Sequence, residues 1–247
     1  MRNIRLVLEY DGTDFAGWQR QPNARTVQEV VEQAISAMVH EPVLLRGAGR
    51  TDAGVHARAQ VANFRTVTAI PCEGLRRGLN GTLPPDVAIV TADDVDDAFD
   101  ARRSARGKLY AYRVWNAPSR SPFRARTSWH LYRPLDVTAM NEAACALLGE
   151  HDFSAFRAAG CDRKNPVRVL RRAEWLAEEP GLLALTLEGT AFLRNMVRVI
   201  AGTLVEVGLH ARPVSDVGRI LVGKDRTEAG RTAPAHGLTL EHVSYAV

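Results

Sequence analysis

Residues 3–10 read NIRLVLEY, and their alternation is the clearest structural signal in the chain. Ile4, Leu6, Leu8 and Tyr10 occupy every second position, so their side chains share one face of an extended backbone. This pattern is typical of a strand with one buried face. A turn is predicted directly after it, at residues 11–12, because an Asp-Gly pair suits a tight bend.

The next signal along the chain is helical. Residues 26–29 read TVQE, which is a capping box, and the apolar residues that follow recur at helical spacing up to Met38. We therefore predict a helix over 26–39. Weaker patterns predict strands over 43–48, 59–66 and 87–91, a glycine-rich loop over 47–54, and a helix over 73–79.

The second half of the chain repeats this order of elements. Its patterns predict strands over 107–116, 167–178, 182–189 and 238–245, and helices that begin near Asp136 and that cover 191–207 and 215–222. A repeated mixture of strands and helices favours two α+β domains built on antiparallel sheets. We place the boundary near 100–106, which divides the chain into residues 1–103 and 104–247.

Length and composition agree with two globular domains. The chain has 247 residues, of which 46% are apolar and 24% charged. The three cysteines, Cys72, Cys145 and Cys161, form no C-x-x-C pair, which argues against a disulfide framework or a structural zinc site. No signal peptide is visible, and no apolar run approaches the ~18–20 residues that span a bilayer. We expect a cytoplasmic protein without a membrane segment.

The charges are unevenly distributed. Of the 32 basic residues only three are lysines, which leaves 29 arginines; either coding bias in a GC-rich genome or phosphate binding would explain the excess.

Residues 101–134 contain no acid. Their basic residues are Arg102, Arg103, Arg106, Lys108, Arg113, Arg120, Arg124, Arg126 and Arg133. Six aromatic residues are interleaved with them, an arrangement that favours contact with RNA phosphates and bases. The alternative is a solvated segment whose aromatic side chains face the core. The acids of 86–100 read as a solvated surface.

Residues 47–57 read GAGRTDAGVHA, and this stretch carries the candidate chemistry. Arg50 and Asp52 are two positions apart, so on an extended backbone they point to the same side. A carboxylate beside a guanidinium stays ionised at neutral pH, and a positioned carboxylate can act as a nucleophile. The same residues also make a good turn, in which an aspartate bonds its own backbone. His56 is more often structural than catalytic in such a setting.

Residues 49–56 (GRTDAGVH) resemble the active-site motif of the tRNA pseudouridine synthase A family. The resemblance continues along nearly the whole chain in the same order. Its further motifs are YDGT (10–13), GWQRQ (17–21), LN with LP (79–80, 83–84), Phe99 with Ala101-Arg102, LG (148–149), DFSAF (152–156), Phe192 with MVR (196–198), Gly202, KDR (224–226), APA (233–235) and GL (237–238).

The resemblance implies roles for four residues. Asp52 matches the nucleophile, and Arg50 matches an arginine that pairs with it and helps to open the RNA. Tyr110 matches the tyrosine that stacks on the target base, and Arg198 an arginine that holds the aspartate from the other side. Six more residues are expected to contact RNA: Arg20, Gln21, Arg58, Arg102, Arg106 and Lys108. The chain departs from the family at Asp100, where a histidine is common, and at 194–195, where some members carry two histidines.

The resemblance also implies a fold, a reaction and partners. The two sheets would join into one extended sheet with helices on one face and a basic cleft on the other. The enzyme would be a homodimer that converts uridine to pseudouridine at positions 38–40 of the tRNA anticodon stem-loop, without cofactor or metal. Two alternatives are a non-catalytic RNA-binding protein, which has no need of Asp52, and a glycosidase, which requires a second acid beside it.

Overall fold

The protein was analysed as a computed structural model that describes residues 1–158 and 165–246. The chain divides into two compact units, Met1–Arg106 with Leu240–Val247 (unit 1) and Gly107–Thr239 (unit 2). Whether each unit is an independent domain stays a prediction. Cys161 and Lys164 lie outside the described residues.

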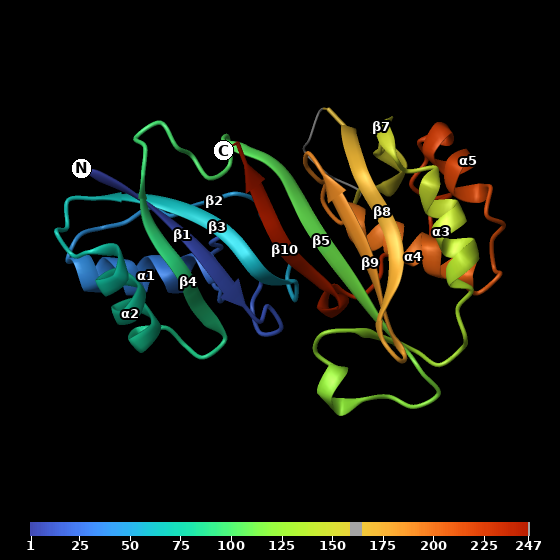
Figure 1. The fold of residues 1–247 in the computed structure, drawn as a ribbon, viewed down its shortest axis with the longest axis horizontal. Coiled ribbons are helices and arrows are strands. Elements are labelled where there is room, and N and C mark those ends of the chain that lie inside the picture. The colour runs from blue at the N-terminus through green and yellow to red at the C-terminus, as the bar shows by residue number, and fades with distance from the viewer. Residues whose placement is uncertain (159–164, 247) are drawn as a thin grey trace. The chain divides into compact units, whose positions relative to one another are not determined.

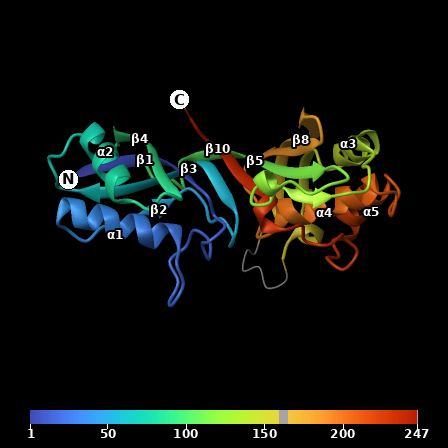
Figure 2. The same cartoon turned by 90° about the horizontal axis from the view of Figure 1, so that it is seen from below.

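Unit 1 is built on antiparallel strand pairs. Strand β1 pairs with β3 on one side and β4 on the other, and the short β2 pairs with β3. Helix α1 lies along this sheet (Figure 2). The elements are β1 (Arg2–Tyr10), α1 (Val27–Val39), β2 (Arg46–Gly47), β3 (His56–Thr66), α2 (Cys72–Thr82) and β4 (Val87–Val95).

Unit 2 contains most of the remaining elements, although β5 begins in unit 1 and β10 lies in unit 1 from Leu240 onward. Strands β5, β9, β8 and β7 pair antiparallel in that order, and β6 is parallel to β5. The elements are β5 (Ala105–Asn116), β6 (Trp129–Leu131), α3 (Val137–Cys145), β7 (Gly149–Asp152), β8 (Val167–Glu179), β9 (Leu182–Gly189), α4 (Met196–Gly208), α5 (Asp216–Gly223) and β10 (Leu238–Tyr245). Three-residue 3-10 helices lie at Pro122–Arg124, Ser154–Phe156 and Ala235–Gly237.

The predicted α+β class is confirmed. Both units combine strands with helices, and in unit 2 helices α3, α4 and α5 pack together beside β7 and β8 (Figure 1). The alternation in β1 buries its apolar face, since Ile4, Leu6 and Leu8 have no exposed surface. Asp136 begins α3 as predicted, because its carboxylate accepts a hydrogen bond from the backbone N–H of Ala139 (2.9 Å). The expected basic cleft stays a prediction.

Several sequence-based predictions are wrong in detail. The helix expected over 191–207 begins only at Met196, because Asn195 adopts a left-handed backbone (φ 61°) that a right-handed helix cannot contain. The strand expected over 43–48 is reduced to Arg46–Gly47. The capping box at 26–29 does not form; the Thr26 hydroxyl is buried and lacks a hydrogen-bond partner among the described residues. Strand β7 and β6 were not predicted.

None of the helices in the described ranges is long and apolar enough to cross a membrane.

Candidate active site

The glycine-rich loop of residues 47–56 is held by the segment that follows β1. The backbone N–H of Trp18 donates to the carbonyl of Thr51 (3.1 Å), and the Thr51 hydroxyl is bonded to the hydroxyl of Tyr10 (2.8 Å). Tyr10 is buried, and this desolvation raises its pKa to about 12, so the phenol stays protonated. Thr51 is therefore fixed through its backbone and its side chain, directly beside Asp52.

Two glycines let the two segments approach at backbone contact. Gly17 has a positive φ (100°), and a Cβ there would lie 2.7 Å from the carbonyl oxygen of Thr51. A Cβ on Gly12 would overlap the carbonyl of Val55. Both glycines belong to the sequence motifs at 10–13 and 17–21, so these motifs act structurally by allowing the loop to be clamped.

Asp52 is half-buried, and its backbone carbonyl accepts from the N–H of Val55 (3.1 Å). The turn interpretation of this segment is therefore correct for the backbone. Arg50 is exposed, and its Nε donates to Oε1 of Gln19 (3.2 Å). The pairing of Arg50 with Asp52 stays a prediction.

His56 has the structural role that its surroundings favour. Its ring is buried, and Nδ1 accepts a hydrogen bond from the backbone N–H of Gly12 (3.0 Å). This contact ties the start of β3 to the turn after β1. This contact helps to hold the loop in place, which is a structural role.

In unit 2, Tyr110 and Tyr112 lie two positions apart on the same face of β5 and differ in their surroundings. The Tyr112 hydroxyl donates to the carbonyl of Pro234 (2.9 Å), and desolvation by burial raises its pKa far above the usual range. Tyr110 is 7% exposed, and its ring meets Phe192 edge-to-face with centroids 5.1 Å apart. The Tyr112 hydroxyl is thus bonded to the backbone of its own unit, whereas the Tyr110 ring, which is also buried, packs against Phe192.

Arg198 projects from the first turn of α4 and is held by two neighbours. Its Nε donates to the carbonyl of Ala233 (2.7 Å), and Nη1 donates to Oδ1 of Asn195 (3.1 Å). The backbone N–H of Ala233 returns a hydrogen bond to the carbonyl of Arg198 (3.0 Å). The segment before Ala233 lies so close to α4 that a side chain on Gly202 would overlap the carbonyl of Arg231. The left-handed Asn195, which shortens the helix, therefore also helps to orient this arginine.

The structure distributes the candidate residues over both units. Asp52 and Arg50 lie in unit 1, and Tyr110 and Arg198 lie in unit 2. Of the further RNA-contact candidates, five are exposed residues of unit 1 and Lys108 is a half-buried residue of unit 2. Two of the exposed arginines already have acidic neighbours, since Arg20 contacts Glu32 (3.2 Å) and Arg58 contacts Glu241 (3.7 Å).

Two arginines of the basic segment 101–134 are paired with acids of another strand. Arg113 forms an ion pair with Glu178 of β8 (2.8 Å), and Arg124 pairs with Glu179 of the same strand. These acids are distant from the arginines in sequence, and β9 lies between β5 and β8 in the sheet. The aromatic residues divide as well: Tyr112 and Trp129 are buried, whereas Phe123 is 98% exposed.

Sequence reasoning did not identify the residues that contact Arg50 or those behind them. Gln19, Gln28 and Glu32 form a hydrogen-bonded network with the Gly-rich loop's arginine. The available signal was a polar pair, Gln28 and Glu32, four positions apart on the apolar face of α1, where they interrupt the pattern of valines.

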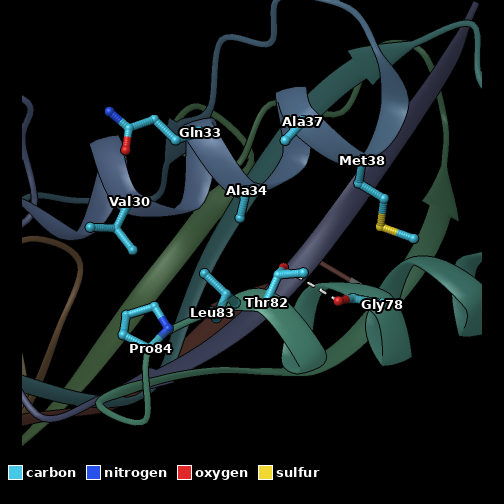
Figure 3. Close-up of a pocket in the computed structure, with 9 residues that line it drawn as sticks. All are labelled: Val30, Gln33, Ala34, Ala37, Met38, Gly78, Thr82, Leu83 and Pro84. Carbon is cyan, nitrogen blue, oxygen red and sulfur yellow. Dashed lines mark hydrogen bonds between the residues drawn. The ribbon is translucent and has the colours of Figure 1, made fainter.

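An apolar groove between α1 and α2 is distinct from the candidate site (Figure 3). None of Asp52, Arg50, Tyr110 or Arg198 lines it. In the part of the chain that the structure describes, no group of three or more potential metal ligands occurs.

Comparison with known proteins identifies the class of enzyme. The family model described as tRNA pseudouridine synthase matches residues 6–102 and 143–246, and the chain belongs to this family. The protein is 50% identical to the tRNA pseudouridine synthase A of Myxococcus xanthus over 99% of this chain and 92% of that one. It is 48% identical to the enzyme of the same name from Syntrophotalea carbinolica over 100% of this chain and 97% of the other.

Among solved structures, a chain of a Cbf5-Nop10-Gar1 complex matches 96% of this chain and 48% of its own length, with 14% identity and a TM-score of 0.37.

Proposed function

We propose that the protein converts uridine to pseudouridine in the anticodon stem-loop of tRNA, at positions 38–40, with Asp52 as the nucleophile. Membership of the tRNA pseudouridine synthase family supports the reaction. The observation that carries the role of Asp52 is the double anchoring of Thr51, by Trp18 and by Tyr10. A loop anchored in this way can hold the neighbouring carboxylate in one place.

The reaction is an isomerisation that requires no net exchange of atoms with a cofactor. The C1′–N1 bond of the uridine breaks, the uracil turns, and a C1′–C5 bond forms; C5 loses a proton and N1 gains one. The Asp52 carboxylate takes part directly, and attack at C6, attack at C1′ and promotion of a glycal are the three routes open to it. The detached base must be retained, so water has to be excluded while it turns.

The target uridine must leave its stack to reach Asp52, and this costs a few kcal/mol. We assign to Arg50 the filling of the vacated space, which agrees with its exposed position on the loop. Arg198 is assigned to the carboxylate, and Tyr110 to stacking on the extruded base. We assign weaker RNA contacts to Arg20, Gln21, Arg58, Arg102, Arg106 and Lys108.

The direct test is to map pseudouridines in tRNA after incubation with the pure protein. We expect new pseudouridine confined to positions 38–40, without added cofactor or metal. A protein that bound tRNA and formed no pseudouridine would be the non-catalytic RNA-binding alternative. Because its substrate is tRNA, we also propose that the enzyme works in the cytoplasm.

The aromatic face of Tyr110 can be tested separately from its volume. We expect Tyr110→Phe to bind tRNA nearly as well as the wild type, because stacking is retained, and to remove the C5 proton more slowly. Tyr110→Leu keeps an apolar side chain against Phe192 and removes the aromatic face; it is expected to weaken productive binding about 5- to 150-fold, the range for one lost base–aromatic stack. Single-turnover kinetics with tRNA measures both. Equal activity of the leucine variant and the wild type would exclude stacking by this ring.

We further propose that the enzyme is a homodimer, and that Phe123 lies in the contact between the copies. Phe123 is 98% exposed on a short helical turn that begins at Pro122, and aromatic side chains are enriched at interfaces between proteins. Phe123→Lys is expected to shift the protein to monomers in sedimentation velocity. Val222→Lys, at an 81% exposed position on α5, serves as the control and should leave the mass unchanged. If Phe123→Lys changes tRNA affinity with the oligomer intact, the residue contacts RNA instead.

A further inference from the structure

A buried polar network connects helix α1 with Arg50. Gln28 and Glu32 are 5% and 4% exposed, and they lie one helical turn apart. Glutamate is rarely buried to this extent unless it is paired. Burial of polar groups is costly when their hydrogen bonds are unmade, so the partners of these two side chains indicate what the network holds.

The Gln28 amide makes the full set of bonds that its chemistry allows. Its Oε1 accepts from Nε2 of Gln19 (2.7 Å) and from the backbone N–H of Arg20 (3.0 Å). Its Nε2 donates to Oε1 of Glu32 (3.0 Å) and to the carbonyl of Leu45 (3.0 Å). An amide has two acceptor and two donor positions, and all are used. The orientation of Gln28 is therefore set by four partners in three separate segments.

Glu32 completes the attachment. Its Oε1 also accepts from the backbone N–H of Leu45 (2.9 Å), and Oε2 accepts from Nη1 of Arg20 (3.2 Å). The two helix residues thereby hold two segments that are connected to the loop. Residues 19–20 follow Trp18, which is bonded to Thr51, and Leu45 precedes the loop in the sequence.

From Arg50 to Glu32, the hydrogen bonds form a chain in which each amide accepts one bond and donates the next. Nε of Arg50 donates to Oε1 of Gln19, Nε2 of Gln19 donates to Gln28, and Nε2 of Gln28 donates to Glu32. Hydrogen bonds in such a chain polarise one another and strengthen the whole. The guanidinium is thus linked to a buried carboxylate through two amides, each oriented by its neighbour.

We infer that Gln28 is a positioning residue that acts through Gln19 to set the direction of Arg50 toward RNA. This inference rests on the proposed role of Arg50. Without Gln28, the Gln19 amide can rotate. Its Oε1 then no longer accepts from Nε of Arg50 in one fixed position. Extrusion of the uridine would slow, whereas tRNA binding depends on many other contacts and would persist.

The test is Gln28→Glu, which has nearly the same shape but cannot donate to Glu32 or Leu45. Repulsion between the new carboxylate and Glu32 is expected to turn side chain 28 away, so that Nε2 of Gln19 loses its fixed acceptor. We expect the single-turnover rate of pseudouridine formation to fall about tenfold, within the range found for coupled residues of one network, with the Kd for tRNA changed less than about twofold. Gln33→Glu is the matched control. Gln33 is an exposed residue of the same helix above the groove in Figure 3, and its substitution should leave both quantities unchanged.

A double-mutant cycle with Arg50→Ala separates positioning from general support of the fold. If Gln28 acts through Arg50, Gln28→Glu should slow the Arg50→Ala enzyme by less than about twofold. An undiminished tenfold loss in that background would overturn the inference, as would an Arg50→Ala enzyme as fast as the wild type. Gln19→Ala, at a half-buried position, should show the same loss of additivity and decides the matter if Gln28→Glu fails to fold. None of these outcomes affects the proposed reaction, which depends on Asp52.

Discussion

Asp52→Asn is expected to release no tritium from tRNA that carries 5-tritiated uridine, while it binds the same tRNA with nearly wild-type affinity. The amide has the size of the carboxylate and lacks its charge, so it cannot attack carbon. Loss of an essential nucleophile commonly costs about 10⁴-fold or more in rate. Tritium release reports loss of the C5 proton and therefore the completed isomerisation, and filter binding measures the affinity.

The fold should tolerate this change, because the contacts that anchor the loop come from other groups. Thr51 is held by Trp18 and Tyr10, and the N–H of Gly54 donates to the carbonyl of Phe15 (3.3 Å). Asp97→Asn, at a largely exposed carboxylate outside the loop, is the control for the change from acid to amide and should remain fully active. Full activity of Asp52→Asn would end the assignment of the nucleophile. Release of free uracil by the wild type would instead favour a glycosidase.

Gly202→Ala is expected to lower both the melting temperature and the rate. The added methyl group meets the carbonyl of Arg231, so the segment 231–233 must move away from α4. Overpacking of this kind costs about 1–3 kcal/mol, which corresponds to a fall in Tm of roughly 2–12 °C for a chain of this length. The carbonyl of Ala233 moves with the segment and no longer holds Nε of Arg198. A shift of about 1 Å at a catalytic group can cost on the order of 100-fold in rate.

Gly81→Ala provides the matched comparison, since Gly81 is also helical and a Cβ there meets nothing within 4 Å. That substitution should leave the rate unchanged and raise stability slightly, because alanine restricts the unfolded chain. Differential scanning calorimetry and single-turnover kinetics measure the two effects. Wild-type Tm and rate for Gly202→Ala would mean that the segment 231–233 does not position Arg198.

The pattern of apolar residues was sufficient to predict most strands and helices. The alternation of 3–10 predicted β1, and the repeats at 26–39 and after Asp136 predicted α1 and α3. These signals are local, since each depends on residues within two turns of a helix or a few positions of a strand. The motif at 49–56 pointed to Asp52 because it resembles a family motif and further motifs of that family follow in the same order along the chain.

The partners of the charged side chains became known only from the tertiary structure. The acids of 86–100 read as a solvated surface, yet Asp86, Asp93 and Asp94 pair with arginines from 2 to 25. The segment 101–134 read as uniformly basic, yet β8 supplies Glu178 and Glu179 to two of its arginines. The pairing of β1 with β4 brings Arg2 and Arg5 to Asp94 and Asp93, and the other pairs also join segments that are far apart in the sequence.

For this protein, the sequence by itself determined the α+β class, the positions of the main elements, the family and the residue to test as nucleophile. Only the tertiary structure decided how Thr51 is clamped, where α4 begins, what holds Arg198, and that Gln28 and Glu32 stand behind Arg50. The physical reason is the separation in sequence of the residues involved. Periodicity and short motifs are properties of neighbouring residues, whereas a hydrogen bond between distant segments exists only after the chain has folded.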